Sequence, residues 1–134
     1  VVLERALQIA IEKTVDSAYA PLAGRAVKIV QEEKFHRVFG DSWLKRLMAD
    51  KLELRETLQT SLNWAWLTTD ACLGPDDDPV VAKLVGHQIL AADGATIRQE
   101  WLAQTTPVLT KNGFTIPETS ADWSDWNVQF RDRS

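Results

Sequence analysis

A helical pattern between residues 22 and 48 constrains this 134-residue chain more than any other feature. Side chains that would face a neighbouring helix recur there at alternating steps of four and three, without interruption. They are Leu22, Ala26, Ile29, Glu33, His36, Gly40, Trp43 and Leu47, and we call these positions the seam. Such a stripe is typical of a helix packed in a bundle, and Gly40 is the place where we expect a kink.

The first 18 residues predict a second long helix. They contain neither glycine nor proline, and an apolar stripe runs through Leu7 and Ile11. The opposite face carries polar side chains, among them Arg5 and Gln8, and we expect that face to be solvated.

The rest of the chain completes an all-α prediction. Pro21 fits the first turn of the helix that contains the seam. Further helices are predicted over about 51–71, about 80–91 and from about 95 onward. The helix over 51–71 carries Leu54, Leu58, Leu62, Trp64, Trp66 and Leu67, and the last helix is expected to turn Ile97, Trp101, Leu102 and Val108 inward. Pro107 is expected to end or bend the last helix. We predict one helical domain over residues 1–134, with 113–134 as an extended tail.

Composition excludes some classes of partner. The net charge is −4 and the pI is about 5.1, whereas nucleic-acid binding requires clustered positive charge. No apolar stretch approaches the ~18 residues of a membrane helix, so we expect no membrane partner. The single cysteine, Cys72, cannot form an internal disulfide, and a cytoplasmic location is therefore expected.

The chain begins at Val1, without methionine and without a capping residue before the first helix. We therefore expect a piece of a longer protein or a processed one. A trimmed, disordered start is the alternative.

Two seam positions are not apolar. Glu33 and His36 lie one helical turn apart and face the same way. Burying an unpaired carboxylate is costly, so something must compensate it. The two side chains can pair with polar groups of a neighbouring helix, or the helix can be rotated so that both are solvated. A metal ion is the third possibility, although an isolated Glu-x-x-His spacing is common.

Glu4 favours the metal. It lies on the apolar stripe of the first helix, about 16 residues before a turn near residue 20, while Glu33 and His36 lie about 13 and 16 residues after it. In a helical hairpin these three side chains reach the same level. A glutamate that faces Glu-x-x-His is half of a carboxylate-bridged di-iron site, in which carboxylates bridge the two irons and each iron takes one imidazole.

The histidine count limits this site. The chain has two histidines, His36 and His87, and Leu84 stands where a second Glu-x-x-His would need its glutamate. The other half of a di-iron centre must therefore come from residues outside this chain, from a second copy or from a different subunit.

Several stretches resemble the phenylacetic acid catabolic proteins, the ferritin-like subunits of bacterial phenylacetyl-coenzyme A epoxidase. They are 19–36 (YAPLAGRAVKIVQEEKFH), 73–78 (LGPDDD), 97–102 (IRQEWL) and 107–117 with Asn112-Gly113 between its prolines. The resemblance covers nearly the whole chain but only the C-terminal half of a family member. It implies half of a ferritin-like helical bundle.

The resemblance also implies a subunit type. The catalytic α-type carries an acidic residue on the first helix of this half and Glu-x-x-His on the second, and Glu4, Glu33 and His36 stand at matching positions. Where the family's acidic residue can be aspartate, this chain has glutamate. The related partner subunit has lost the metal site and typically has its glutamate four residues before the histidine, which Glu32 satisfies. The catalytic assignment therefore depends on Glu4.

The resemblance implies a monooxygenase component that epoxidises the ring of an aromatic acyl-CoA, with iron as cofactor and electrons from a separate reductase. Glu4, Glu33 and His36 would be metal ligands, and no further catalytic residue is assigned. This chain alone is expected to be inactive, because half of the site is missing. Two alternatives stay open: a non-catalytic, metal-free scaffold subunit of the same complex, and a homodimeric ferritin-like protein that binds metal between its copies.

Two surfaces carry weaker expectations. Arg25, Lys28 and Arg37 lie on outer faces of the second helix and could meet coenzyme A phosphates, although a solvated face is the simpler interpretation. Trp123, Trp126 and Phe130 are either a docking tail for another chain or ordinary packing.

Overall fold

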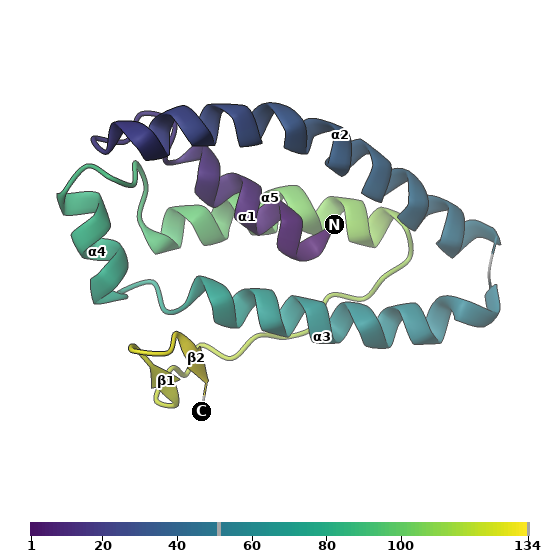
Figure 1. Ribbon diagram of the computed structural model, residues 1–134. Coiled ribbons are helices and arrows are strands. Elements are labelled where there is room, and N and C mark those ends of the chain that lie inside the picture. Colours follow the sequence, from purple (N-terminus) through teal and green to yellow (C-terminus); the bar gives the residue numbers. More distant parts are fainter. Residues whose placement is uncertain (51, 134) are drawn as a thin grey trace.

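The computed structural model describes residues 1–50 and 52–133, and this part of the chain is built from helices (Figure 1). They are α1 (Val2–Glu12), α2 (Ala20–Asp50), the 3₁₀ turn η1 (Leu52–Leu54), α3 (Arg55–Leu73), α4 (Pro79–Gly86) and α5 (Gly94–Lys111). Two short strands, β1 (Trp126–Asn127) and β2 (Asp132–Arg133), pair antiparallel in the tail. The all-α prediction is confirmed. None of the described helices has the length and apolar character needed to cross a membrane.

The helix ends depart from the expected ones where tertiary packing outweighs local preference. α1 stops at Glu12, short of the predicted residue 18, and α2 begins at Ala20 with Pro21 in its first turn, as expected. α2 continues through Gly40 and curves gently (Figure 1), and there the Ser42 hydroxyl donates to the Val38 carbonyl at 2.7 Å. α5 does not end at Pro107, because the fully buried Leu109 packs its last turn into the core.

Two aspartates start the later helices. The Asp78 carboxylate accepts a hydrogen bond from the Val80 amide at 2.9 Å, and the Asp93 carboxylate accepts one from the Thr96 amide at 2.8 Å. Hydrogen bonds from Thr96 lower the pKa of the Asp93 carboxyl group below its ordinary value. This cap therefore stabilises α5 at neutral pH, and its contribution is lost as the pH falls through the lowered pKa.

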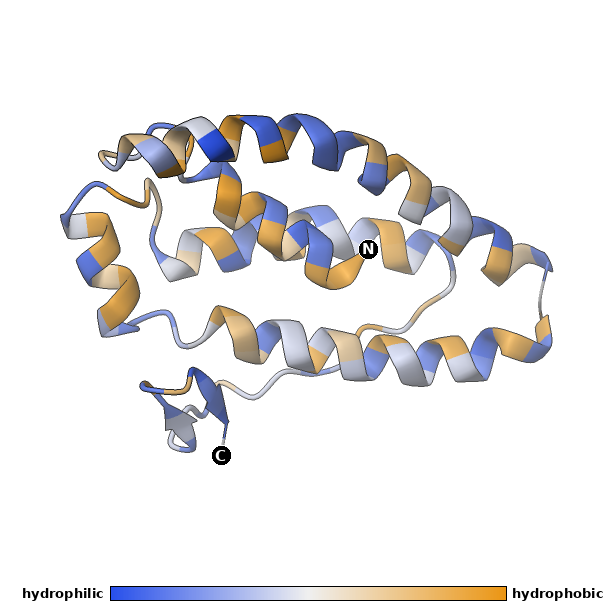
Figure 2. Cartoon of the chain, in the orientation of Figure 1, coloured by the Kyte–Doolittle hydropathy of each residue, from blue (hydrophilic) through white to orange (hydrophobic). Residues whose placement is uncertain are grey.

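The helix α1 occupies the centre of the fold. It contacts α2, α3 and α5, and Figure 1 shows α1 and α5 lying between the long helices α2 and α3. Figure 2 shows that hydrophobic and hydrophilic residues alternate along both α1 and α5. A helix covered on three sides cannot keep a fully solvated polar face.

The central position of α1 overturns the predicted orientation of its faces. Arg5 and Gln8, expected in solvent, are only 5% and 3% exposed. Leu7, expected to face inward, is 53% exposed, while Ala6 and Ile9 are buried. The apolar stripe predicted from spacing thus turns toward the one uncovered side of α1.

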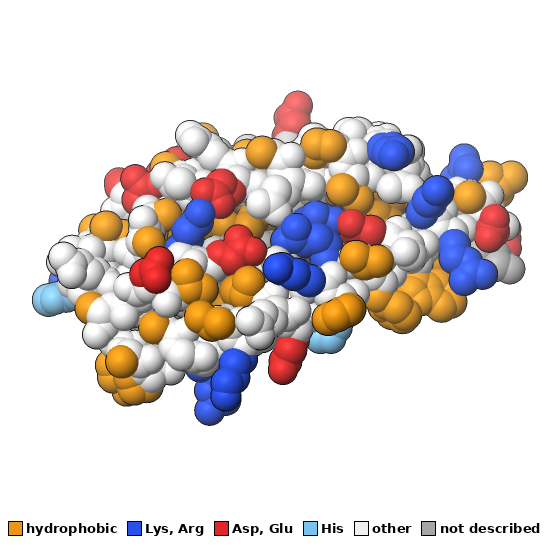
Figure 3. Space-filling model, turned by 90° about the horizontal axis from the view of Figure 1, so that it is seen from above, with side chains coloured by type: hydrophobic (Ala, Val, Ile, Leu, Met, Phe, Trp, Pro, Cys, Tyr) orange, Lys and Arg blue, Asp and Glu red, His pale blue; other side chains and the backbone are white. Residues whose placement is uncertain are grey.

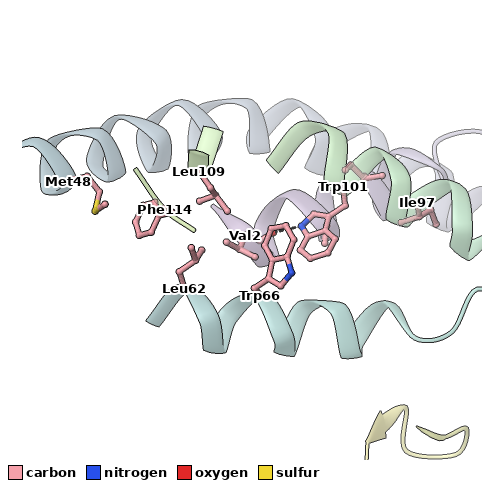
Figure 4. Packing of buried hydrophobic residues seen from close by; sticks show 10 residues of the cluster. Val2, Met48, Leu62, Trp66, Ile97, Trp101, Leu109 and Phe114 are labelled. Atoms are coloured by element: carbon pink, nitrogen blue, oxygen red, sulfur yellow. Dashed lines mark hydrogen bonds between the residues drawn. The ribbon is translucent and has the colours of Figure 1, made fainter. Parts of the chain in front are cut away.

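The core centres on two tryptophans. The rings of Trp66 from α3 and Trp101 from α5 lie with their centroids 4.4 Å apart, both almost fully buried (Figure 4). The Trp101 indole also donates to the Val2 carbonyl at 3.1 Å, which ties α5 to the first turn of α1. Trp64 and Leu67 of α3 point away from this core and are 72% and 48% exposed. Of the residues expected to face inward from α5, Leu102 is wrong, because it is 36% exposed.

The α2 helix is less buried than its seam predicts. Ala26 of the seam is buried, whereas Trp43 is 46% exposed. Phe39 and Phe35 precede Trp43 by four and eight residues on the same face of the helix, and both are also exposed. Figure 3, which looks down on α2, shows hydrophobic side chains among charged ones on this face. Only one edge of the seam is packed, because no helix of the described chain lies over the other edge.

The tail folds back onto the turn between α3 and α4. Arg131 pairs with the fully buried carboxylate of Asp78. The guanidinium groups of Arg98 and Arg133 lie 5.4 and 3.9 Å from the centroid of the Trp123 ring. Gly74 has a positive φ of 72°, and a Cβ there would lie 3.0 Å from the Trp126 ring.

Arg98 anchors this turn to α5. It pairs with the buried Asp70 and donates to the Gly74 carbonyl. Burial, and secondarily the charge of Arg133, lower the pKa of the Arg98 guanidinium, and Asp70 compensates the desolvation. The two tail tryptophans are half-buried against their own chain, while Phe130 remains 69% exposed.

Replacing Asp78 with alanine is expected to lower the free energy of unfolding by about 2–3 kcal/mol, since it removes both the cap of α4 and the buried partner of Arg131. Urea denaturation measures this loss. Asp77→Ala is the matched control, because the Asp77 side chain is exposed, and its effect should stay within about 0.5 kcal/mol. Equal effects of the two substitutions would contradict the structural role of Asp78.

Candidate metal centre

Three predicted residues lie together where α1 crosses α2. Glu4 comes from α1, and Glu33 and His36 come from adjacent turns of α2. One ligand atom from each side chain lies within 4.8 Å of the other two. His36 Nδ1 is 3.3 Å from Glu33 Oε1 and 3.7 Å from Glu4 Oε1. We call these three residues the carboxylate–histidine cluster.

The local sequence explains this approach. The turn between α1 and α2 reverses the chain, so that the start of α1 returns to the middle of α2 (Figure 1). Gly40 lies at the contact, where an added Cβ would be 3.2 Å from Val1 Cγ2 and 3.9 Å from Glu4 Oε2. The missing side chain therefore leaves room for the first turn of α1 beside α2.

The cluster is open on one side. The Glu4 and Glu33 side chains are 31% and 22% exposed, but the His36 side chain is 64% exposed. The expectation that all three would be buried on apolar seams is wrong for His36, because no helix of the described chain covers that edge of α2. The cluster thus faces a space that another polypeptide segment or a ligand can occupy.

An apolar groove of about 590 Å³ runs beside the two glutamates. It is lined by residues of α1, α2, α3 and α5: Val1, Val2, Leu3, Glu4, Leu7, Gln8, Ile11, Glu33, Leu44, Leu58, Ser61, Leu62, Ala65 and Leu109. Leu3 and Leu7, the exposed stripe of α1, form part of its wall. The groove has the size and lining of a small-molecule site.

The donor set suits a hard or borderline transition metal. Two carboxylates and one imidazole are the ligands that iron and manganese accept in proteins. Among the described residues, this cluster is the one group of three or more histidine, cysteine, aspartate or glutamate side chains close enough to share an ion. Metal binding by these residues stays a prediction.

Other sequence candidates lie elsewhere. His87 is exposed at the C-terminal end of α4. Arg25 and Lys28 are exposed on α2, as expected, but Arg37 is not simply solvated, because its Nε donates to Gln8 Oε1 at 3.1 Å.

Sequence reasoning missed a polar contact beside the cluster. Arg5 of α1 pairs with Asp41 of α2, and Nη2 lies 2.6 Å from Asp41 Oδ1. A hint was present in the spacing, since Arg5 and Gln8 stand one turn apart on α1 while Arg37 and Asp41 stand one turn apart on α2. The orientation of α1, which brings these two pairs face to face, is a property of the tertiary structure.

Similarity to known proteins extends over almost the whole chain. The sequence profile of the phenylacetic acid catabolic proteins matches residues 1–132. The chain is also 29% identical over 126 residues to the A component of the 1,2-phenylacetyl-CoA epoxidase of Escherichia coli (strain K12). That alignment covers 92% of this chain but 40% of the relative, so the chain spans about two fifths of the relative's length. With a match over almost every residue, this all-α chain belongs to the phenylacetic acid catabolic protein family.

Proposed function

We propose that this chain is part of the catalytic subunit of a di-iron monooxygenase that epoxidises the ring of an aromatic acyl-CoA of the phenylacetyl type, in phenylacetate degradation. The observation that carries the proposal is the carboxylate–histidine cluster, because it joins three metal-ligand side chains in a member of this family. The named relative, a component of an epoxidase that acts on phenylacetyl-CoA, supports the same substrate class. The domain is then half of a ferritin-like bundle.

The residues present fit iron. Glu4, Glu33 and His36 would hold it, and Nδ1 is the histidine nitrogen that faces both carboxylates. The carboxylates supply negative charge that balances the cations, and a neutral imidazole adds a donor without further charge. A bound di-iron pair supplies the redox chemistry that transfers one oxygen atom of dioxygen to a ring.

The chain's own residues would prepare the place for that chemistry. Glu4 and Glu33 line the groove as well as the cluster, so a molecule in the groove lies next to the metal ligands. The leucines of the groove wall favour an aromatic ring over a polar group. The ring of the acyl group is therefore the part of the substrate that we place in the groove.

This chain would supply half of the ligands. The other half would come from further residues, from another subunit or from a second copy of this chain. The electrons would come from a separate reductase. The open side of His36 gives such a partner access to the cluster.

One observation favours a second candidate, a metal-free scaffold subunit of the same complex. The 3.3 Å contact between His36 Nδ1 and Glu33 Oε1 can persist as a hydrogen bond without metal. A homodimeric ferritin-like metal protein is the third candidate, in which two copies of the cluster would meet.

Iron analysis of the protein, purified with the subunits that accompany it, separates the three candidates. Two irons per assembled site, together with reductant-dependent oxidation of phenylacetyl-CoA, are expected for the catalytic subunit. An iron-free chain inside an active complex would identify a scaffold. Two irons per homodimer without other subunits would identify the third candidate.

A further inference from the structure

Two polar links join α1 to α2 directly beside the carboxylate–histidine cluster. In the first, Arg5 Nη2 contacts both carboxylate oxygens of Asp41, at 2.6 Å from Oδ1. The Arg5 side chain is only 6% exposed, so this guanidinium has little access to water. In the second, Arg37 Nε donates to Gln8 Oε1, and the Gln8 amide in turn donates to Glu12 Oε1 at 2.9 Å.

The links and the cluster share one register between the helices. Glu4 and Arg5 are neighbours on α1, and they meet α2 at successive turns, Glu4 at His36 and Arg5 at Asp41. The alignment that brings Arg5 to Asp41 therefore also brings Glu4 to His36. Sliding α1 along α2 by one turn, about 5.4 Å, would separate both pairs at once.

Burial makes the first link the decisive one. A nearly buried guanidinium that loses its carboxylate partner is left as an uncompensated charge, which is strongly unfavourable. Val2, Ala6 and Ile9 of α1 are also buried in the core, but an apolar contact that shifts by one turn leaves no unpaired charge behind. Gly40, next to Asp41, removes the side chain that would hold the helices apart at this point.

We propose that Arg5 and Asp41 are positioning residues for the metal centre: their ion pair holds α1 in the register that places Glu4 against Glu33 and His36. This inference rests on the proposed metal function. It predicts that breaking the pair changes metal binding without touching any ligand, because ligands displaced from their partners bind a metal less tightly.

The test measures the binding of Co²⁺, used as a probe ion, to the full-length protein in the assembly that it forms. Arg5→Met is expected to weaken Co²⁺ binding by about 10- to 100-fold and to change the visible ligand-field absorption of the bound ion. Arg5→Lys keeps the positive charge and should restore part of the affinity. Circular dichroism verifies that the helices are intact.

Lys13→Met is the matched control. Lys13, the residue that follows α1, also links this part of the chain to another helix through an ion pair, with Nζ 2.6 Å from Glu100 Oε1 of α5. This variant should bind Co²⁺ with wild-type affinity and spectrum, because its pair does not lie between α1 and α2. Equal weakening by Lys13→Met and Arg5→Met would show general destabilisation and overturn the inference.

The outcomes also separate this inference from the proposed function. If the wild-type protein binds Co²⁺, His36→Ala does not, and Arg5→Met binds as the wild type does, positioning by Arg5 is refuted and the metal function stands. If neither the wild type nor His36→Ala binds the ion, both proposals fall. Should Arg5→Met not fold, Asp41→Asn keeps the size of the partner and is expected to show the same weakening and spectral change.

Discussion

Replacing His36 with alanine is expected to abolish iron binding in the assembled protein while leaving the helices intact. His36 supplies the one nitrogen donor of the carboxylate–histidine cluster, and two carboxylates alone hold a transition metal less firmly than the full set. The His36 side chain is 64% exposed, so its truncation should change the free energy of unfolding by less than about 0.5 kcal/mol. Iron content by elemental analysis and helix content by circular dichroism measure the two effects.

His87→Ala is the matched control for this prediction. His87 is the other histidine of the chain, is exposed, and lies at the end of α4, where it takes no part in the cluster. Iron content should be unchanged in this variant. Full iron content in His36→Ala would refute the cluster as a metal centre.

Trp66→Ala is expected to lower the free energy of unfolding by about 3–5 kcal/mol, a large share of the stability of a small domain. The Trp66 ring is 1% exposed and lies 4.4 Å, centroid to centroid, from Trp101, so its removal leaves a large cavity between α3 and α5. Urea denaturation, monitored by circular dichroism, measures the change.

Trp64→Ala controls for the loss of a tryptophan from the same helix. Trp64 is 72% exposed, and its replacement should alter stability by no more than about 0.5 kcal/mol. If both substitutions destabilised the protein equally, the assignment of Trp66 rather than Trp64 to the core would be wrong.

Helix content and the juxtaposition of Glu4, Glu33 and His36 could be predicted from sequence because both depend on local geometry. Three- and four-residue spacing defines a helix face, and the rise per residue places side chains at equal distances from a turn on one level. α2 also begins beside Pro21, because proline has no amide hydrogen to lose in a first turn.

Spacing alone could not tell which face of a helix is buried. On α1 the apolar stripe with Leu7 faces the open groove, while Arg5 and Gln8 are buried. Three helices contact α1, and polar side chains can be buried among them because each finds a hydrogen-bond partner. On α3 the choice between Trp64 and Trp66 was likewise made by the position of Trp101, far away in the sequence.

The sequence by itself therefore determined the helices and the set of candidate metal ligands, since a repeat of hydrophobic positions and a spacing from a turn are properties of the chain alone. Only the tertiary structure decided that α1 is central, that Arg5 pairs with Asp41, and that His36 is open on one side. The physical reason is that burial and ion pairing depend on neighbours many residues away, whose approach no local pattern encodes.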